Sequence, residues 1–216
     1  MIITYQGLEF FKIQQGDITL AINPISKDSK HKGARFGADA VLVTTNHPDM
    51  NGVEQMEFGD KKPLVISGPG EYETKGVFIK GFASPSHYSI SGGKEIINTV
   101  YLVSFDSMNM LFLGALDTVD IPKEITEAIE DIDILFIPIG GEGVLDSAGA
   151  HKLAVNLEPK LIIPMHYGMV GKANAFKAFL KEEGEENAKP EEKLTLKKKD
   201  LEGKEGEIAV LTAPSA

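Results

Sequence analysis

Residues 132–168 read IDILFIPIGGEGVLDSAGAHKLAVNLEPKLIIPMHYG, and this stretch decides the fold. It contains two apolar runs, Ile132–Ile139 and Leu161–Met165, which predict buried strands. Between them, residues 146–156 carry apolar side chains at helical spacing, and Asp146 is suited to cap the first turn of that helix. The segment therefore predicts strand, helix and strand, with a glycine-rich loop after the first strand and a histidine after the second.

The same patterns extend along the rest of the chain. A hairpin turn is expected at residues 15–17, and residues 182–207 are so highly charged that they predict a solvated surface. Late helices after a strand-rich half favour two sheets with helices outside, in one domain over residues 1–216. The other expected strands are Leu8–Ile13, Ile18–Ile22, Ala40–Thr44, Leu64–Ile66, Gly76–Gly81, Thr99–Phe105, Asn109–Leu113 and Ile208–Leu211, and the other expected helices are Pro122–Glu130 and Ala173–Glu183.

Composition excludes several classes of function. The 216 residues include 22 Lys and Arg against 32 Asp and Glu, so the net charge is −10 and broad binding to nucleic acid is not expected. Cysteine is absent, which excludes disulfides, thiolate zinc sites and cysteine nucleophiles. No apolar run is long enough to predict a membrane span, and the N-terminus lacks the pattern of a signal peptide. The expected location is therefore the cytoplasm.

Three histidines lie at or near the ends of predicted strands, where sites gather in α/β folds. His47 and Asp49 follow the strand at 40–44, and an imidazole with a nearby carboxylate is half of a zinc site. His166 ends the strand at 161–165, and His87 lies in a loop. The alternatives are an Asp turn at residues 47–49 and a histidine bonded to backbone at 166. Of the two other histidines, His31 is expected to be solvated and His151 to lie on the surface of the helix at 146–156.

Two glycine-rich loops have simpler explanations than ligand binding. Residues 68–73 read GPGEYE and predict a tight turn. Residues 139–143 read IGGEG between a strand and a helix, which favours close packing of helix and sheet over an anion cradle. The sequence contains neither a nucleotide P-loop nor the Gly-x-Ser-x-Gly elbow of serine hydrolases.

Taken together, these segments resemble the metallo-β-lactamase fold. The most similar group is a family of predicted zinc-dependent hydrolases that also contains the ascorbate-6-phosphate lactonases. The resemblance covers almost the whole chain and implies an α/β fold, a four-layer αββα sandwich with metals at the edges of its sheets. It is carried by Met1–Phe11, Arg35–Val43, Gly68–Glu73, Asn98–Tyr101, Ile137–Gly141 and Ile163–Tyr167, in the family's order.

The resemblance also shows where this chain departs from the family. The family's first metal motif reads His-any-His-any-Asp-His, whereas residues 45–50 here read TNHPDM. Thr45 and Met50 therefore replace two histidines, and Ala115 replaces the aspartate that bridges the two metals. The remaining positions match the family's ligands and are His47, Asp49, His87 and His166.

Counting ligands predicts a degenerate metal site. Each half of the dinuclear centre retains two ligands, whereas catalytic zinc normally has three protein ligands and a water. The expected function is that of a metallo-β-lactamase-fold protein that does not hydrolyse by the two-metal route. Asp117, two residues beyond Ala115, is a less favoured substitute for the missing bridge.

The alternative is a single-metal hydrolase of a lactone, phosphodiester or other ester, using the four remaining ligands and Asp49 as a catalytic group. Zinc or another divalent metal is then expected to be weakly bound or absent. A small-molecule ligand and self-association remain open, whereas nucleic acid and membrane are not expected. The substitutions Thr45→His, Met50→His and Ala115→Asp are expected to rebuild the ligand set in loops outside the core.

Overall fold

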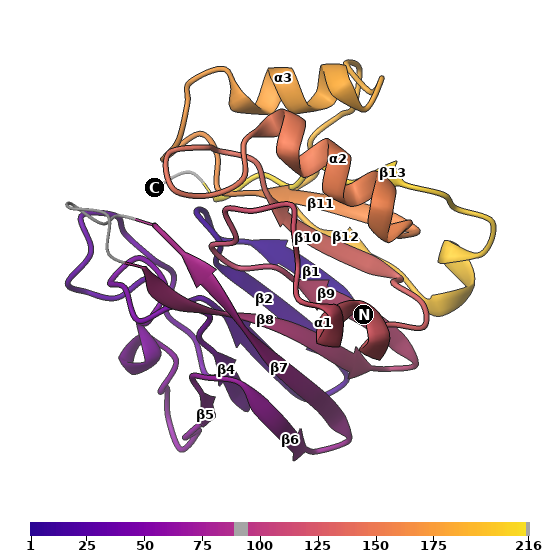
Figure 1. Cartoon of the computed structure of the whole chain (residues 1–216). Coiled ribbons are helices and arrows are strands. Elements are labelled where there is room, and N and C mark those ends of the chain that lie inside the picture. The colour runs from indigo at the N-terminus through magenta and orange to yellow at the C-terminus, as the bar shows by residue number, and fades with distance from the viewer. Residues whose placement is uncertain (89–94, 215–216) are drawn as a thin grey trace.

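The computed structural model describes residues 1–88 and 95–214, which form two β-sheets packed face to face (Figure 1). One sheet has the strand order β12-β1-β2-β3-β4-β5 and the other has the order β13-β11-β10-β9-β8-β7-β6. The strands are β1 (Ile2–Tyr5), β2 (Phe11–Gln15), β3 (Ile18–Ile22), β4 (Ala40–Leu42), β5 (Leu64–Ile66), β6 (Gly70–Thr74), β7 (Val77–Ser86), β8 (Ile96–Phe105), β9 (Met108–Phe112), β10 (Ile134–Pro138), β11 (Leu161–Met165), β12 (Leu194–Thr195) and β13 (Glu207–Ile208).

The main core lies between the two sheets. Apolar side chains alternate along the strands, so each sheet presents one apolar face to the other. At its centre the ring of Phe11 meets Phe112 and Phe136 edge-on, at centroid distances of 5.9 and 4.9 Å. These edge-to-face contacts join the two sheets.

The helices α1 (Lys123–Ala128), α2 (Ser147–Leu157) and α3 (Ala175–Glu182) cover the outer face of the seven-stranded sheet (Figure 1). Within the described ranges, the outer face of the six-stranded sheet is covered differently. Side chains such as Ile25, Ala38 and Met56, from loops and the 3-10 turn η1 (Val53–Gln55), pack against it in place of α-helices. The two-sheet sandwich is confirmed, but the expected fourth layer consists of loop.

Most expected elements are present with small shifts at their ends. Asp146 caps α2 as expected, because its carboxylate accepts the backbone N–H of Gly149 at 3.0 Å. Residues 15–17 form the hairpin turn between β2 and β3. The charged stretch 182–207 is not wholly solvent-facing, because its strand β12 pairs with β1. Within the described residues, no helix is long and apolar enough to cross a membrane.

The side chain of Asp39, just before β4, ties together segments that belong to both sheets. The side chain of Asp39 is 6% exposed and accepts hydrogen bonds from Lys61 at 2.8 Å, Lys75 at 2.6 Å and the backbone N–H of Thr19 at 2.9 Å. Burial alone would raise the pKa of Asp39, but the bonds from both lysines and from Thr19 outweigh it and lower that pKa to about 2.

Asp39→Asn is expected to lower the free energy of unfolding by about 2 kcal/mol at pH 7, because the carboxyl pKa rises by nearly two units on unfolding. Since the folded-state pKa is depressed, this stabilisation is complete above about pH 4 and is lost as the pH falls through about 2. Urea unfolding at several pH values checks it. Asp60→Asn, at an exposed position, is the control, and an equal loss in both variants would contradict this role of Asp39.

Candidate functional site

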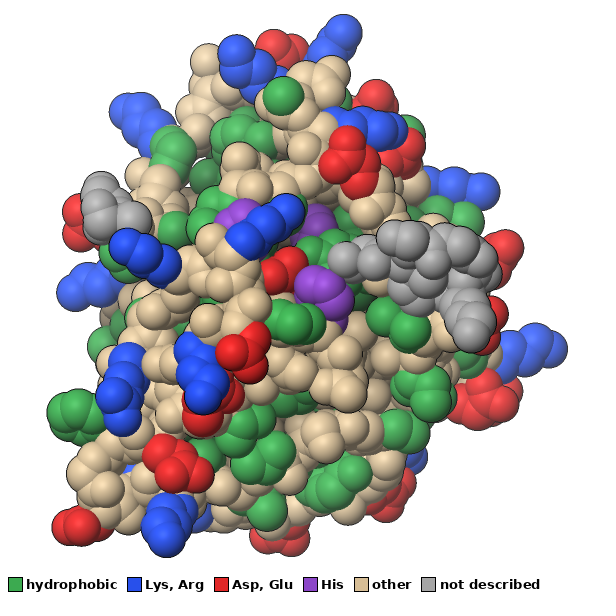
Figure 2. Space-filling view, turned by 90° about the vertical axis from the view of Figure 1, so that its left-hand side faces the viewer, with side chains coloured by type: hydrophobic (Ala, Val, Ile, Leu, Met, Phe, Trp, Pro, Cys, Tyr) green, Lys and Arg blue, Asp and Glu red, His purple; other side chains and the backbone are tan. Residues whose placement is uncertain are grey.

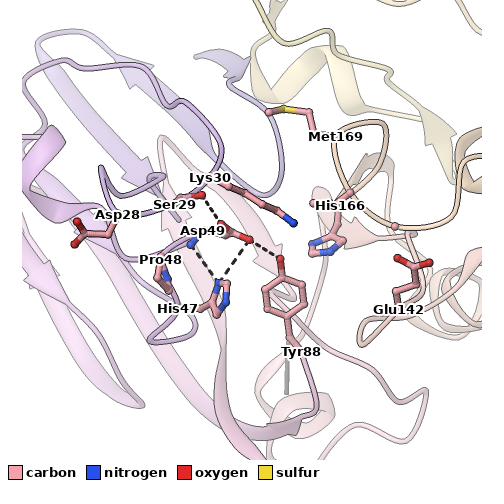
Figure 3. A pocket seen from close by; sticks show the side chains of 12 residues that line it. Asp28, Ser29, Lys30, His47, Pro48, Asp49, Tyr88, Glu142, His166 and Met169 are labelled. Carbon is pink, nitrogen blue, oxygen red and sulfur yellow. Dashed lines mark hydrogen bonds and ion pairs between the residues drawn. The ribbon is translucent and has the colours of Figure 1, made fainter. Parts of the chain in front are cut away.

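A polar pocket of about 630 Å³ lies at the edge of the sandwich, where loops after several strands meet (Figure 3). The loop after β4 supplies His47 and Asp49, Tyr88 follows β7, and His166 follows β11. Figure 2 shows imidazole groups near the centre of this face, with lysine and acidic side chains around them. The other lining residues are Asp28, Ser29, Lys30, Pro48, Glu142, Met169, Val170 and Gly171.

Asp49 is the buried carboxylate of this pocket. It is 5% exposed, and its two oxygens accept hydrogen bonds from the hydroxyl groups of Ser29 and Tyr88, the latter at 2.8 Å. Burial alone would raise the pKa of Asp49, but these two hydrogen bonds outweigh it and hold that pKa below its ordinary value. Asp49 is therefore ionised at neutral pH, with each oxygen already bonded to a hydroxyl group.

His47 lies beside Asp49 in an orientation that sets its tautomer. Its Nδ1 accepts the backbone N–H of Asp49 at 3.2 Å, so we assign the ring proton to Nε2. Burial lowers the pKa of His47 because it disfavours the charged imidazolium. His47 is therefore neutral at pH 7, and a ring nitrogen that carries a proton cannot bind a metal ion.

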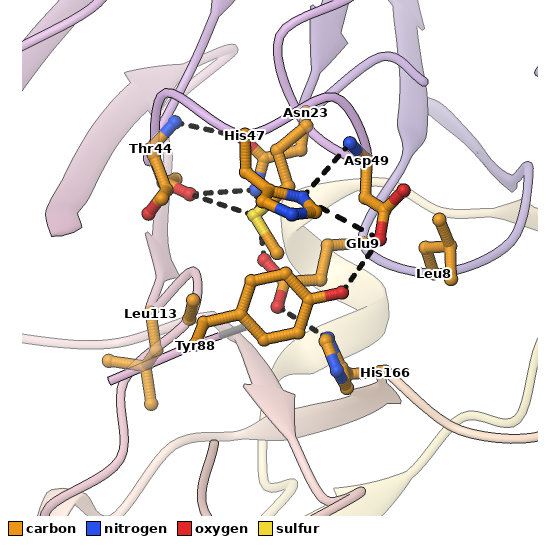
Figure 4. A network of polar contacts seen from close by, with 12 residues as sticks. Leu8, Glu9, Asn23, Thr44, His47, Asp49, Tyr88, Leu113 and His166 are labelled. Carbon is orange, nitrogen blue, oxygen red and sulfur yellow. Dashed lines mark hydrogen bonds and ion pairs between the residues drawn. The ribbon is translucent and has the colours of Figure 1, made fainter. Parts of the chain in front are cut away.

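His166 is held by a second buried carboxylate, Glu9 (Figure 4). The Nδ1 atom of His166 lies 2.8 Å from Oε1 of Glu9, and the two side chains are 1% and 0% exposed. The other oxygen of Glu9 accepts a hydrogen bond from Asn23 at 2.9 Å, and the backbone N–H of His166 donates to the carbonyl oxygen of Leu8 at 2.6 Å. Nδ1 is thereby occupied, and Nε2 is the ring nitrogen of His166 left for the pocket.

The backbone around the pocket is strained at several positions. Leu8, Asn23, Glu142 and His166 all have left-handed backbone angles, with φ of 56°, 49°, 56° and 59°. Such angles are unfavourable for residues other than glycine and tend to gather at functional sites. Gly140 is required beside them, since a Cβ there would lie 2.2 Å from the carbonyl oxygen of His166. This supports close packing as the role of the 139–143 loop.

Tyr88 fills the space between the two imidazoles. Its ring centroid lies 5.0 Å from that of His47 and 5.0 Å from that of His166, with nearly perpendicular planes in both pairs. Behind the ring, Met50 and Ala115 form an apolar cluster with it, and Val144 completes the cluster. Burial, together with the adjacent carboxylate of Asp49, raises the pKa of Tyr88. The phenol therefore stays protonated and donates to Asp49.

The structure does not bring His87 to this pocket. Side chains alternate at the end of β7, so Ser86 and Tyr88 are buried while His87 points outward with its side chain 53% exposed. There its Nδ1 lies 2.6 Å from the carboxylate of Asp117. Asp117 is therefore engaged outside the pocket and does not take the place of the bridging aspartate that the family resemblance implies at position 115.

Thr45, Met50, Ala115 and His31 lie differently from expectation, whereas His151 lies at the surface as expected. Thr45, Met50 and Ala115 are 2%, 0% and 0% exposed, so they belong to the buried interior and not to loops outside it. His31 was expected to be solvated, but its Nε2 atom is buried without a hydrogen-bond partner among the described residues. His151 is partly exposed and contacts Glu183 at 3.1 Å.

Two buried asparagines tie the loops of the site to the sheets, and the sequence patterns did not single them out. Asn23 exchanges hydrogen bonds with Thr44 across β3 and β4, both at 2.8 Å. Asn98 donates to the carbonyl oxygen of Leu113 and accepts from the backbone N–H of Ala115, each at 2.9 Å. Because both side chains are fully buried, these bonds fix the loop positions firmly.

The donor set does not fit a resident metal as the side chains stand. Within the described ranges, no three His, Asp or Glu side chains are grouped closely enough to hold an ion. Nδ1 of His47 already accepts a backbone N–H, and both oxygens of Asp49 are bonded to hydroxyl groups. The Tyr88 ring lies between the imidazoles.

Two packed sheets with a histidine- and aspartate-bearing pocket at their edge define the class of metallo-β-lactamase-like sandwiches. The chain belongs to the β-lactamase superfamily, because the model of that family, described as "Beta-lactamase superfamily domain", matches residues 2–166.

Relatives in the family carry names that refer to metals. A protein of Lysinibacillus sphaericus named UPF0173 metal-dependent hydrolase is 27% identical over 195 residues, covering 77% of this chain and 85% of the relative. A protein of Archaeoglobus fulgidus with the same name is 26% identical over 77% of this chain and 83% of its own length. The resemblance to a metal-dependent hydrolase family is thus confirmed.

Solved structures agree on the fold. A candidate Zn-dependent hydrolase of the metallo-β-lactamase superfamily from Thermotoga maritima superposes with a TM-score of 0.74 at 25% identity, over 98% of this chain and 99% of that one. Igni18, a metallo hydrolase from Ignicoccus hospitalis, superposes with a TM-score of 0.66 at 18% identity, over 99% and 96% of the two chains.

Proposed function

We propose that this protein has kept the metallo-β-lactamase fold and its pocket but has a degenerate metal centre, so that it does not hydrolyse substrates by the two-metal route. The observation that carries the proposal is the apolar cluster of Met50, Ala115, Val144 and Tyr88. Two of its members, Met50 and Ala115, stand where the family resemblance implies metal ligands. Two-metal hydrolysis needs ions about 4 Å apart with a shared ligand, and alanine offers no such ligand.

The pocket itself supports a role in binding a small molecule. Its volume of about 630 Å³ lies within the usual range for ligand pockets. The proton on Nε2 of His47 and the ammonium group of Lys30 offer donors, while Glu142 offers an acceptor. A non-hydrolytic binding role is consistent with these groups.

Purified tag-free protein, dialysed against metal-free buffer, is expected to contain well under one zinc per chain. The reason is that three of the seven family ligand positions are occupied by Thr45, Met50 and Ala115. Elemental analysis by plasma mass spectrometry measures the content of zinc, manganese and iron. A stoichiometric metal that survives dialysis would overturn the proposal.

That outcome would favour the second candidate, a single-metal hydrolase of a lactone, phosphodiester or other ester. The names of the relatives are the observation in its favour. His47, Asp49 and His166 would be its ligands, and His87 would need to turn inward to join them. Replacing either His47 or His166 with alanine should then abolish metal binding. A metal ion bound elsewhere would stay bound in both variants.

A further inference from the structure

We propose that the ligand of this protein is an amphiphile. Its oxyanion head, a carboxylate or a phosphate, lies in the polar pocket, and its apolar tail extends past Met169 into a second, apolar pocket. The inference rests on the proposed function, because it assumes that no metal ion occupies the place of the head. It goes further by naming the chemical class of the ligand.

The apolar pocket has a volume of about 310 Å³ and lies between the loop after β11, the helix α3 and the chain after β13. Aromatic rings form much of its wall. The ring of Tyr167 stacks on that of Phe176 at a centroid distance of 4.7 Å and on that of Tyr5 at 6.0 Å. This volume is at the lower end of the usual range for ligand pockets, so it suits one part of a ligand better than a whole one.

The side chains of the apolar pocket offer a ligand no free hydrogen-bond donor. Three of them carry a hydroxyl group, and each of these donates to a backbone carbonyl oxygen. The pairs are Tyr5 with Leu8 at 2.8 Å, Tyr167 with Leu211 at 3.2 Å and Thr212 with Glu191 at 3.3 Å. A polar ligand group placed here would lose its hydrogen bonds to water without replacement, so the pocket favours an apolar occupant.

Met169 is the residue that lines both pockets. It follows His166 of the polar pocket and Tyr167 of the apolar pocket in the loop after β11 (Figure 3). Its side chain is 44% exposed, unbranched and flexible, so it can turn aside to let a tail pass. A ligand that fills both pockets therefore passes this side chain, with its polar end on one side and its apolar end on the other.

The polar pocket favours a negatively charged head. Lys30 lines it, and among the described residues the Lys30 ammonium group forms no ion pair. The protonated Nε2 of His47 is a second donor. Both oxygens of Asp49 already accept hydroxyl groups, and Asp28 points away from the Lys30 ammonium group in Figure 3. Glu142 is the carboxylate left to oppose an anion, and it is exposed, so solvent weakens its effect.

Calorimetric titrations of the metal-free native chain with butanoate, octanoate, octyl phosphate and octylammonium test the inference. Octanoate should bind at least about tenfold more tightly than butanoate, because each methylene group that leaves water adds about fourfold to the affinity. Octylammonium should bind more weakly than octanoate, and the tighter of octanoate and octyl phosphate identifies the oxyanion. Equal affinities for butanoate and octanoate, or tighter binding of octylammonium than of both anions, would overturn the inference.

Two variants with matched controls assign the ends of the ligand. Lys30→Met should weaken octanoate binding about fivefold, whereas Lys32→Met, at an exposed position outside both pockets, should change it by less than about twofold. Met169→Gln should also weaken it about fivefold, because the amide loses water when a tail passes, whereas Met169→Leu stays apolar and should not.

The failure of the inference differs from the failure of the proposed function. If Lys30→Met and Met169→Gln both bind octanoate as the native chain does, the ligand lies elsewhere and the inference fails. A stoichiometric metal in the dialysed native chain would overturn the proposed function, and elemental analysis detects it without any ligand.

Discussion

Replacing Glu9 with alanine is expected to lower the free energy of unfolding by about 3 kcal/mol or more, one of the largest single-residue effects in this protein. Glu9 is fully buried and accepts hydrogen bonds from Nδ1 of His166 and from Nδ2 of Asn23. Removing its carboxylate leaves two buried donors without partners and a cavity between the sheets and the pocket. Urea unfolding monitored by circular dichroism measures the loss.

Glu9→Gln separates the hydrogen bonds from the charge. Its amide oxygen can accept from Asn23, and its NH₂ group can donate to Nδ1 of His166 if the imidazole moves its proton to Nε2. We therefore expect less than half of the alanine loss, together with a change of the His166 tautomer visible in ¹⁵N NMR of the ring. Glu57→Ala, at an exposed position, is the control. Equal losses of unfolding free energy for Glu9→Ala and Glu57→Ala would contradict the stabilising role of the Glu9–His166 pair.

The sheets and helices were largely predictable because their signals are local. Continuous apolar runs predicted β10 and β11, and a capping aspartate at residue 146 predicted the start of α2. The strand β12 was missed because it has only two residues and lies in a charged stretch, where no alternation of apolar side chains is visible. It is held to β1 by backbone hydrogen bonds. The loop layer over the six-stranded sheet was missed because isolated apolar residues such as Ile25 and Met56 show no periodicity.

The site was predictable only in part. His47, Asp49 and His166 follow apolar strands, so the sequence pointed to them and the structure places them around one pocket. Tyr88 was missed because a single residue of loop length decides whether it or His87 points inward.

Two sequence patterns could have identified Tyr88 and Glu9, the two residues of the site that the sequence analysis did not single out. The alternation of Ser84, Ser86 and Tyr88 continues the inward face of β7, which leaves His87 on the outer side. Glu9 lies between Leu8 and Phe10 in an otherwise apolar run, and a carboxylate buried in such a run requires a partner. The partner of Tyr88 is Asp49 and that of Glu9 is His166. Both partners are distant in sequence, so only the three-dimensional structure could identify them.

The triple variant Thr45→His, Met50→His, Ala115→Asp is expected to lose more than about 4 kcal/mol of stability in chelator, and zinc is not expected to restore it. The sequence placed these positions in loops outside the core, but all three are buried, and Ala115 lies in the apolar cluster with Met50 and Tyr88. In the triple variant a carboxylate at 115 and an imidazole at 50 would therefore replace the apolar contacts that Ala115 and Met50 now make with Tyr88 and Val144.

Zinc should fail to rescue this triple variant because the ring of Tyr88 still occupies the space between His47 and His166. Adding Tyr88→Ala should change the result: the quadruple variant should melt at least about 5 °C higher in saturating zinc than in chelator, since a ligand that binds only the folded state stabilises it. Melting curves of both variants, with and without zinc, make the comparison, and Ala115→Ser is the control for added polarity without charge. If zinc stabilises the triple variant while Tyr88 is intact, the ring of Tyr88 must move aside when the ligand set is complete. The loss of the metal site would then be due to the replaced ligands at positions 45, 50 and 115 alone.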